Sequence, residues 1–256
     1  MRVKRKRLAY LALVATVPIP SQATTIIAVI YGNAIYFASD SKLSYVGNPA
    51  QDAPKTGCKI AHSATRAFAC AAPATDTVTG FDLNKTLTNL LSTQRTLNDW
   101  VTQSDDAIRA NMPPVLDHIK RDFPAAYAAR LGFILAECAF ASWGSESPAL
   151  IDDIWLLDRN GTLRHEPWNL LKADGKNLVV IGARSAIEEY FRGPLPPPPA
   201  DERGIPPRLE MLIRLQIEAS EHSPDPILGP TVGPPISILR LDVAGAHWEK
   251  QGVCEK

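Results

Sequence analysis

The residues that follow position 23 limit how this chain can fold more than any other part of the sequence. The pair Gly32-Asn33 suits a tight hairpin turn, and it is flanked by two runs rich in Ile, Val, Tyr and Phe, Thr25–Tyr31 and Ala34–Ala38. Asp40 ends the second run. The sequence therefore predicts that the fold begins with an antiparallel β-hairpin.

A second hairpin and two helices are expected next. The hairpin is predicted from Lys59–His62 and Arg66–Cys70. Apolar residues at helical spacing predict one helix from Asp76 to about Trp100. A second helix is predicted over Asp105–Lys120, and Pro113-Pro114 is expected to break or kink it.

The remaining apolar runs predict more strands and another pair of helices. Strands are expected at Leu131–Ala139, Asp153–Leu157, Thr162–His165, Leu178–Ile181 and Ile236–Val243. Helices are expected at Ser185–Phe191 and Arg208–Ser220. Strands thus alternate with pairs of helices, an order that indicates an α+β fold in which helices cover two mainly antiparallel sheets. We expect a four-layer αββα sandwich.

The first 23 residues have the pattern of a secretory signal peptide. A basic start precedes the apolar stretch Leu8–Ile19, and Ser21-Gln22-Ala23 places small residues where signal peptidase reads. The stretch is shorter than the roughly 20 residues of a membrane-spanning helix, although an uncleaved anchor is the alternative. Cleavage before Thr24 would leave residues 24–256 as one periplasmic or secreted domain without membrane association.

The distribution of charge argues against nucleic-acid binding. The 256 residues include 27 Lys and Arg and 27 Asp and Glu, and the 45% hydrophobic content is typical of a globular chain. Five of the basic residues lie within the first seven positions and no acid precedes Asp40, so the rest of the chain has a formal charge of −5. A mildly acidic body without a basic run gives no electrostatic basis for binding nucleic acid.

The four cysteines permit disulfides in an exported chain. If the second hairpin turns at Ala64, Cys58 lies opposite Cys70, which leaves Cys138 to pair with Cys254. The alternative is four buried thiols. No cysteine has the spacing of a metal site and the five histidines are scattered, so neither a metal nor a cofactor is expected.

The residues from Thr24 to Ser44 resemble the opening of proteasome β-subunits and of the related bacterial ATP-dependent protease HslV. Those proteins begin with Thr-Thr and a hairpin that closes with an Ala-x-Asp-Ser segment. The resemblance continues through Lys59-Ile60 and Ala71–Asp76, and more loosely through later segments to Ile236. It implies the fold of the N-terminal-nucleophile (Ntn) hydrolases over residues 24–256.

The resemblance implies that an N-terminal threonine is the nucleophile. Its hydroxyl attacks the substrate, and its free α-amine, with an unperturbed pKa near 8, is the general base. Thr24 and Thr25 are both candidates. Two observations favour Thr24: the expected cleavage site lies before it, and sixteen residues separate it from Asp40, as in the family.

Further residues take roles from the resemblance alone. Lys59 corresponds to the family's buried lysine, which lowers the pKa of the nucleophilic hydroxyl and is held by an aspartate, here Asp40. The backbone N–H of Ala72 corresponds to the oxyanion hole. Ser44 would pair with the backbone of an extended substrate. The residues that would support the α-amine are Ser185, Asp225 and Thr231.

The sequence therefore predicts an exported threonine peptidase that cleaves peptide bonds through an acyl-enzyme on Thr24. Two alternatives remain, an amidase for a small non-peptide amide and an inactive scaffold or binding subunit. Expected substrates are peptides or unfolded polypeptides. Relatives form rings, which suggests a homo-oligomer, but no ATPase partner is expected because no ATP is supplied outside the cytoplasm.

Overall fold

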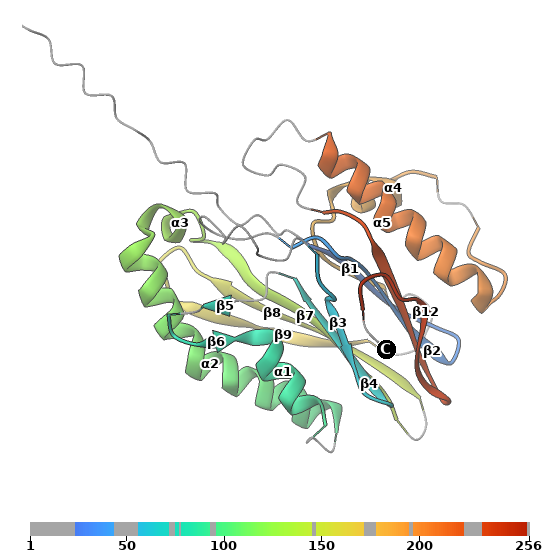
Figure 1. The fold of residues 1–256 in the computed structure, drawn as a ribbon, viewed down its shortest axis with the longest axis horizontal. Coiled ribbons are helices and arrows are strands. Elements are labelled where there is room, and N and C mark those ends of the chain that lie inside the picture. The colour runs from blue at the N-terminus through green and yellow to red at the C-terminus, as the bar shows by residue number, and fades with distance from the viewer. Residues whose placement is uncertain are drawn as a thin grey trace, which may run out of the picture.

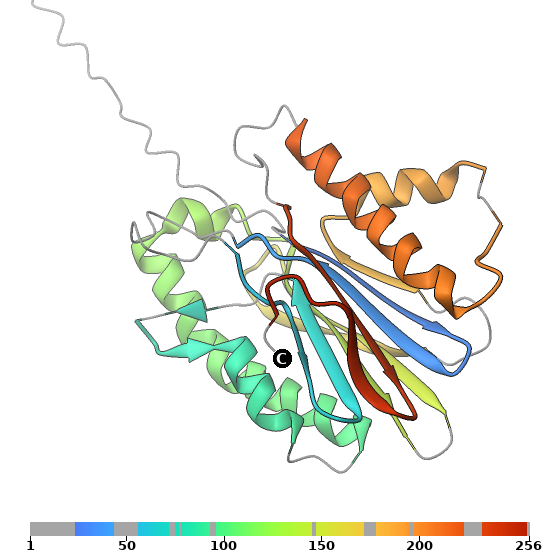
Figure 2. The same ribbon diagram turned by 45° about the vertical axis from the view of Figure 1, so that its right-hand side comes forward.

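Figures 1 and 2 show the protein from two directions as a computed structural model. It describes residues 24–43, 56–71, 75–76, 78–92, 96–144, 147–171, 178–194, 197–222 and 232–254. The expected signal peptide lies outside the described residues, as do four candidate site residues, Ser44, Ala72, Asp225 and Thr231. Among the described residues, no helix has the length and apolar character needed to cross a membrane.

The first sheet has the N-terminal hairpin near its centre. Its strand order is β10-β1-β2-β11-β12, and all neighbours are antiparallel. All seven residues of β2 are buried, because both faces of this strand are covered. The strands are β1 (Thr25–Tyr31), β2 (Ala34–Asp40), β10 (Leu178–Gly182), β11 (Ile236–Asp242) and β12 (Gly245–Lys250).

The second sheet is also antiparallel and contains the other hairpins. Its strand order is β3-β4-β7-β8-β9. Its strands are β3 (Ile60–His62), β4 (Arg66–Ala71), β7 (Phe133–Trp143), β8 (Pro148–Leu157) and β9 (Leu163–Leu171). A separate two-stranded sheet pairs β5 (Thr75–Asp76) with β6 (Phe81–Asp82).

Helices cover the outer faces of the two sheets. One hydrophobic cluster joins α1 and α2 to β4, β7 and β8, a second lies between the sheets, and a third joins α4 and α5 to β1, β2 and β11. Figure 1 shows the two helix pairs on opposite sides of the sheets. This confirms an α+β fold with helices over two antiparallel sheets. The helices are α1 (Leu83–Leu91), α2 (Leu97–Asp122), α3 (Pro124–Ala128), α4 (Ser185–Arg192) and α5 (Ile205–Glu221), with a 3₁₀ turn at Glu202–Gly204.

The single helix predicted from Asp76 to about Trp100 is wrong. The structure ends α1 at Leu91 and begins α2 after a capping box, in which Thr96 and Asp99 each accept a hydrogen bond from the other's backbone N–H. A capping box satisfies two backbone donors that a helix start leaves without helical partners, so it favours a new start at this point.

The sequence predicted a break or a kink at Pro113-Pro114, and no break occurs there, because α2 continues to Asp122. Proline removes a helical donor, which leaves the carbonyls of Arg109 and Ala110 without their usual partners. Both prolines and both of these residues are exposed. Water can therefore satisfy the carbonyls, and the buried face of the helix is left intact.

Two disulfides join the four cysteines, in pairs that differ from the prediction. Cys58 is bonded to Cys254, and Cys70 to Cys138. The presence of two disulfides fits an oxidising environment outside the cytoplasm.

The register of the second hairpin explains why Cys58 does not pair with Cys70. β3 and β4 pair Ile60 with Ala69, which differs by one residue from the register that would place the two cysteines opposite each other. A shift of one residue turns side chains to the opposite face of a sheet. Cys70 instead lies directly opposite Cys138 on the neighbouring strand β7.

Candidate active site

The carboxylate of Asp40, at the end of β2, is the centre of a buried hydrogen-bond network. Its Oδ1 accepts hydrogen bonds from the backbone N–H of Thr25 at 2.8 Å and from Nζ of Lys59 at 2.9 Å. Its Oδ2 accepts from the backbone N–H groups of Lys42 at 3.1 Å and Gly233 at 3.2 Å. Asp40 is fully buried, so these four donors replace the water that a carboxylate otherwise binds.

Strand pairing brings these groups together. The β1–β2 register pairs Ile26 with Ser39, which places Thr25 next to Asp40. On the other side of β2, β11 pairs Ile236 with Asp40, so the segment before β11 approaches the same carboxylate. The site thus depends on two neighbouring strand pairs of the first sheet and on the residue that precedes β3 in the second.

Burial shifts the pKa values of the two charged groups toward each other. It raises the pKa of Asp40, while Lys59 and the backbone N–H groups of Thr25 and Gly233 oppose the rise. It lowers the pKa of Lys59, while Asp40 opposes the fall. Because three backbone donors also stabilise the ionised carboxylate, we take Asp40 as charged and Lys59 as protonated. Lys59 is then a buried cation held by the carboxylate of Asp40.

Thr24 is held beside this network through its backbone. Its carbonyl accepts a hydrogen bond from the backbone N–H of Ala183 at 2.7 Å. Gly182 makes this approach possible, because it has a φ of +80° and an added Cβ would lie 2.0 Å from the carbonyl oxygen of Thr24. Asp40 binds the N–H of the peptide group that joins Thr24 to Thr25. The position of Thr24 is therefore fixed from two sides.

The side chain of Thr25 already has a structural role. Thr25 is fully buried, and its hydroxyl donates a hydrogen bond to the carbonyl of Ala183 at 2.7 Å. A hydroxyl committed to this contact is a poor nucleophile candidate. Of the two adjacent threonines, the geometry therefore favours Thr24, as the sequence spacing did.

Ser185 is not joined to the Asp40 network by any hydrogen bond within the described part of the chain. It is the first residue of α4, and its side chain is exposed. The backbone of Ala183, two residues earlier, makes the contacts with Thr24 and Thr25 instead. The proposed roles of Ser185 and of the four candidates outside the described residues stay predictions.

Glu137 and Arg184 form a second charged pair beside Thr24, which the sequence reasoning missed. Glu137, on β7, accepts hydrogen bonds from the backbone N–H of Gly182 at 3.3 Å and from Nη1 of Arg184 at 3.0 Å. Burial raises the pKa of Glu137, and Arg184 opposes the rise. The pair supports the turn after β10 that holds Thr24. A single glutamate within the apolar run Leu131–Ala139 was the available signal.

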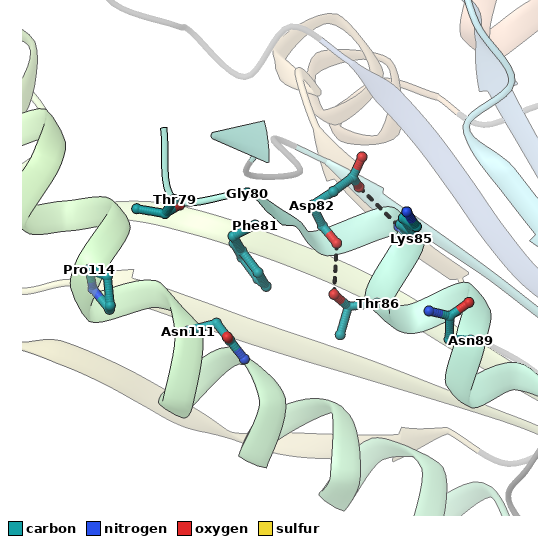
Figure 3. A pocket seen from close by; sticks show the side chains of 9 residues that line it. All are labelled: Thr79, Gly80, Phe81, Asp82, Lys85, Thr86, Asn89, Asn111 and Pro114. Atoms are coloured by element: carbon teal, nitrogen blue, oxygen red, sulfur yellow. Dashed lines mark hydrogen bonds between the residues drawn. The ribbon is translucent and has the colours of Figure 1, made fainter. Parts of the chain in front are cut away.

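Two cavities lie near the helices that cover the second sheet. A small one of about 100 Å³ adjoins Lys59 and is lined by Cys58, Lys59, Ile60, Ala61, Phe68, Asn84 and Thr88. A larger one of about 330 Å³ opens between the start of α1 and α2, and Figure 3 shows its mostly polar lining. The hydrogen bonds among its lining residues stabilise the start of α1, because Asp82 accepts from the backbone N–H of Lys85 and from the hydroxyl of Thr86. No residue of the Asp40 network lines this larger cavity.

In comparisons with known proteins, the chain matches no family model and no curated protein sequence. The function must therefore be argued from the residues and their geometry.

Proposed function

We propose that the protein is an exported Ntn hydrolase, similar to proteasome β-subunits, that cleaves peptide bonds through an acyl-enzyme on Thr24. One observation carries this proposal: the fully buried Asp40 binds both Nζ of Lys59 and the backbone N–H that directly follows Thr24. A buried ion pair is costly unless its hydrogen bonds are satisfied, and here it is positioned next to the candidate nucleophile. The helix-covered pair of antiparallel sheets also supports the proposal.

The proposed reaction requires a free α-amine on Thr24, which cleavage after Ala23 supplies. The neutral amine accepts the proton of Oγ1 while Oγ1 bonds to the substrate carbonyl carbon. The resulting ammonium returns a proton to the leaving amine as the C–N bond breaks, which leaves an ester on Thr24. Water then adds to the ester with the amine again accepting a proton. The bond between the carbonyl carbon and Oγ1 breaks, the ammonium returns the proton to Oγ1, and the acid product leaves.

Lys59 and Asp40 contribute electrostatics to this reaction. A fixed cation near Thr24 favours the developing negative charge on oxygen, and the low-dielectric surroundings strengthen its effect. Asp40 fixes the cation and, through the N–H of Thr25, the backbone of the nucleophile. The backbone N–H of Ala72 is proposed to bind the oxyanion.

A covalent probe tests the proposal on exported protein. We expect N-terminal sequencing to begin at Thr24, and an epoxyketone peptide to add one mass increment to the N-terminal fragment. Thr24→Ala should abolish labelling and hydrolysis of a peptide library, whereas Thr162→Ala, at an exposed turn, should retain both. A mature start elsewhere, or full activity in Thr24→Ala, would overturn the proposal.

The same experiment separates the two alternatives. Labelling of Thr24 together with turnover of a panel of small amides, but not of peptides, would identify a small-molecule amidase. A mature chain that begins at Thr24 and yet remains unlabelled would identify an inactive scaffold. The ring suggested by the resemblance is tested by the mass of the mature protein in solution.

A further inference from the structure

Two aspartates and a histidine meet on the outer face of the second sheet, apart from the Asp40 network. Asp105 is on α2, Asp153 on β8 and His165 on β9. Nε2 of His165 lies 2.5 Å from Oδ1 of Asp153 and 3.3 Å from Oδ1 of Asp105. One potential ligand atom from each residue lies within 4.8 Å of the other two.

The carboxylate of Asp153 is deeply buried and incompletely satisfied. Its side chain is 0% exposed, and Oδ2 accepts no hydrogen bond from the described residues. The side chains of Asp105 and His165 are 12% and 16% exposed, so the cluster has a narrow opening to solvent. A buried carboxylate oxygen without a donor costs free energy, which a bound cation would remove.

Neighbouring side chains position Asp105 and His165 but place no cation against the two carboxylates within the described residues. Trp155 donates its Nε1–H to Asp105 at 3.1 Å and stacks on the ring of His165 at 4.6 Å between centroids. The guanidinium of Arg109 lies over the ring of Trp155, 5.2 Å from its centroid. Oδ1 of each carboxylate thus faces Nε2 of the one imidazole.

We propose that Asp105, Asp153 and His165 bind a zinc ion, with water as the fourth ligand. Imidazole with carboxylate oxygens suits zinc better than magnesium or calcium, which prefer oxygen ligands alone. Two carboxylates balance the charge of the ion. Ligands at zinc distances are separated by about 3.4 Å in a tetrahedron, close to the contact between Asp105 and His165. Binding displaces the proton on Nε2 of His165 to solvent and widens its contact with Asp153.

The ion would join α2 to β8 and β9, which also contact α2 through apolar packing and through the hydrogen bond from Trp155 to Asp105. The role is structural, because the cluster shares no residue with the Asp40 network. Sequence spacing does not reveal the site, because Asp105 lies on a helix remote in sequence from the hairpin of β8 and β9 that contributes Asp153 and His165.

Titration calorimetry with zinc chloride tests the site. The exported protein is stripped with a chelator and titrated near pH 7.5, and we expect one zinc per chain. Asp153→Asn and His165→Gln should each weaken zinc binding at least tenfold. His118→Gln is the matched control, because His118 also lies on α2 and contacts two carboxylates, those of Asp76 and Asp122. It should keep wild-type affinity, and millimolar magnesium should not displace the zinc.

Three results would overturn the proposal: no zinc bound by the wild type, equal binding by the ligand variants, or loss of binding in His118→Gln. A midpoint of unfolding that changes with pH but not with zinc would show that the cluster holds only a proton, and would also overturn it. Circular dichroism checks each fold. If Asp153→Asn does not fold, Asp105→Asn, whose side chain is less deeply buried than that of Asp153, decides in its place.

Discussion

Replacing Lys59 by methionine should destabilise the protein strongly while filling nearly the same space. Among the described residues, Lys59 is the charged one of four donors to Asp40, which without it would stay buried with three backbone N–H groups. Breaking a buried ion pair from one side typically costs about 3–5 kcal/mol. For a chain of this length, that corresponds to a fall of about 6–20 °C in the midpoint of thermal unfolding.

The pH dependence of this loss follows from the direction of the Asp40 shift. Burial raises the pKa of Asp40 in the folded state, so its ionisation opposes folding wherever no cation compensates. In Lys59→Met, lowering the pH through this folded-state pKa protonates Asp40 and removes the uncompensated charge. The difference in free energy of unfolding between variant and wild type should therefore shrink as the pH falls from 7 toward 5.

Urea unfolding, followed by tryptophan fluorescence with both disulfides intact, measures this difference. Lys42→Met is the matched control, because Lys42 contributes only its backbone N–H to Asp40 and its side chain is half-buried. We expect the control to cost less than about 1 kcal/mol. A loss below about 1 kcal/mol in Lys59→Met, or a loss that grows as the pH falls, would refute the reasoning.

Three further predictions concern the turn that holds Thr24, the Cys70–Cys138 disulfide and the α-amine proposed as the general base. Gly182→Ala should destabilise the protein by about 1–3 kcal/mol more than Gly80→Ala and should reduce hydrolysis. Both glycines have a positive φ, but of the two only Gly182 has a backbone atom where the added Cβ would lie. Equal losses of stability would contradict this. Replacing both Cys70 and Cys138 by alanine should lower the free energy of unfolding by about 4 kcal/mol, from the closed loop spanning 68 residues; an unchanged urea midpoint would refute it. Hydrolysis should rise with pH through about 8, since the α-amine of Thr24 must be neutral, and should level above it; a rate that falls over this range would exclude the amine as base.

Much of the fold could be predicted because its strands are apolar on both faces or alternate clearly between apolar and polar residues. The N-terminal hairpin shows this best, since Gly32-Asn33 marks its turn and both runs around it are buried. β12 could not be predicted in the same way. It is an edge strand whose residues Gly245–Lys250 are half-buried or exposed, so no apolar run marks it.

The errors came from local interactions that apolar periodicity does not record. The capping box at Thr96 and Asp99 separates two helices whose apolar residues read as one. The pairing of Cys58 depends on a one-residue difference in hairpin register, which a turn of small residues leaves undetermined.

The candidate site also contains residues that the sequence predicted and residues that only the structure revealed. Asp40 and Lys59, which the resemblance paired, are in direct contact. Gly233 belongs to the Asp40 network, and Glu137 and Arg184 form a separate pair beside Thr24. Sequence spacing could not predict either, because these contacts join residues that are remote in sequence.

The Cys58–Cys254 bond and the contact of Gly233 with Asp40 set an order on events during synthesis of the chain. Both connect residues made early with residues made 196 and 193 positions later. A nascent chain therefore lacks one donor to Asp40 and the covalent tie beside Lys59 until those later residues have been made. Removing Cys254 should leave the chain permanently without this covalent tie, so the segment after β12 supports the centre that lies at the N-terminus.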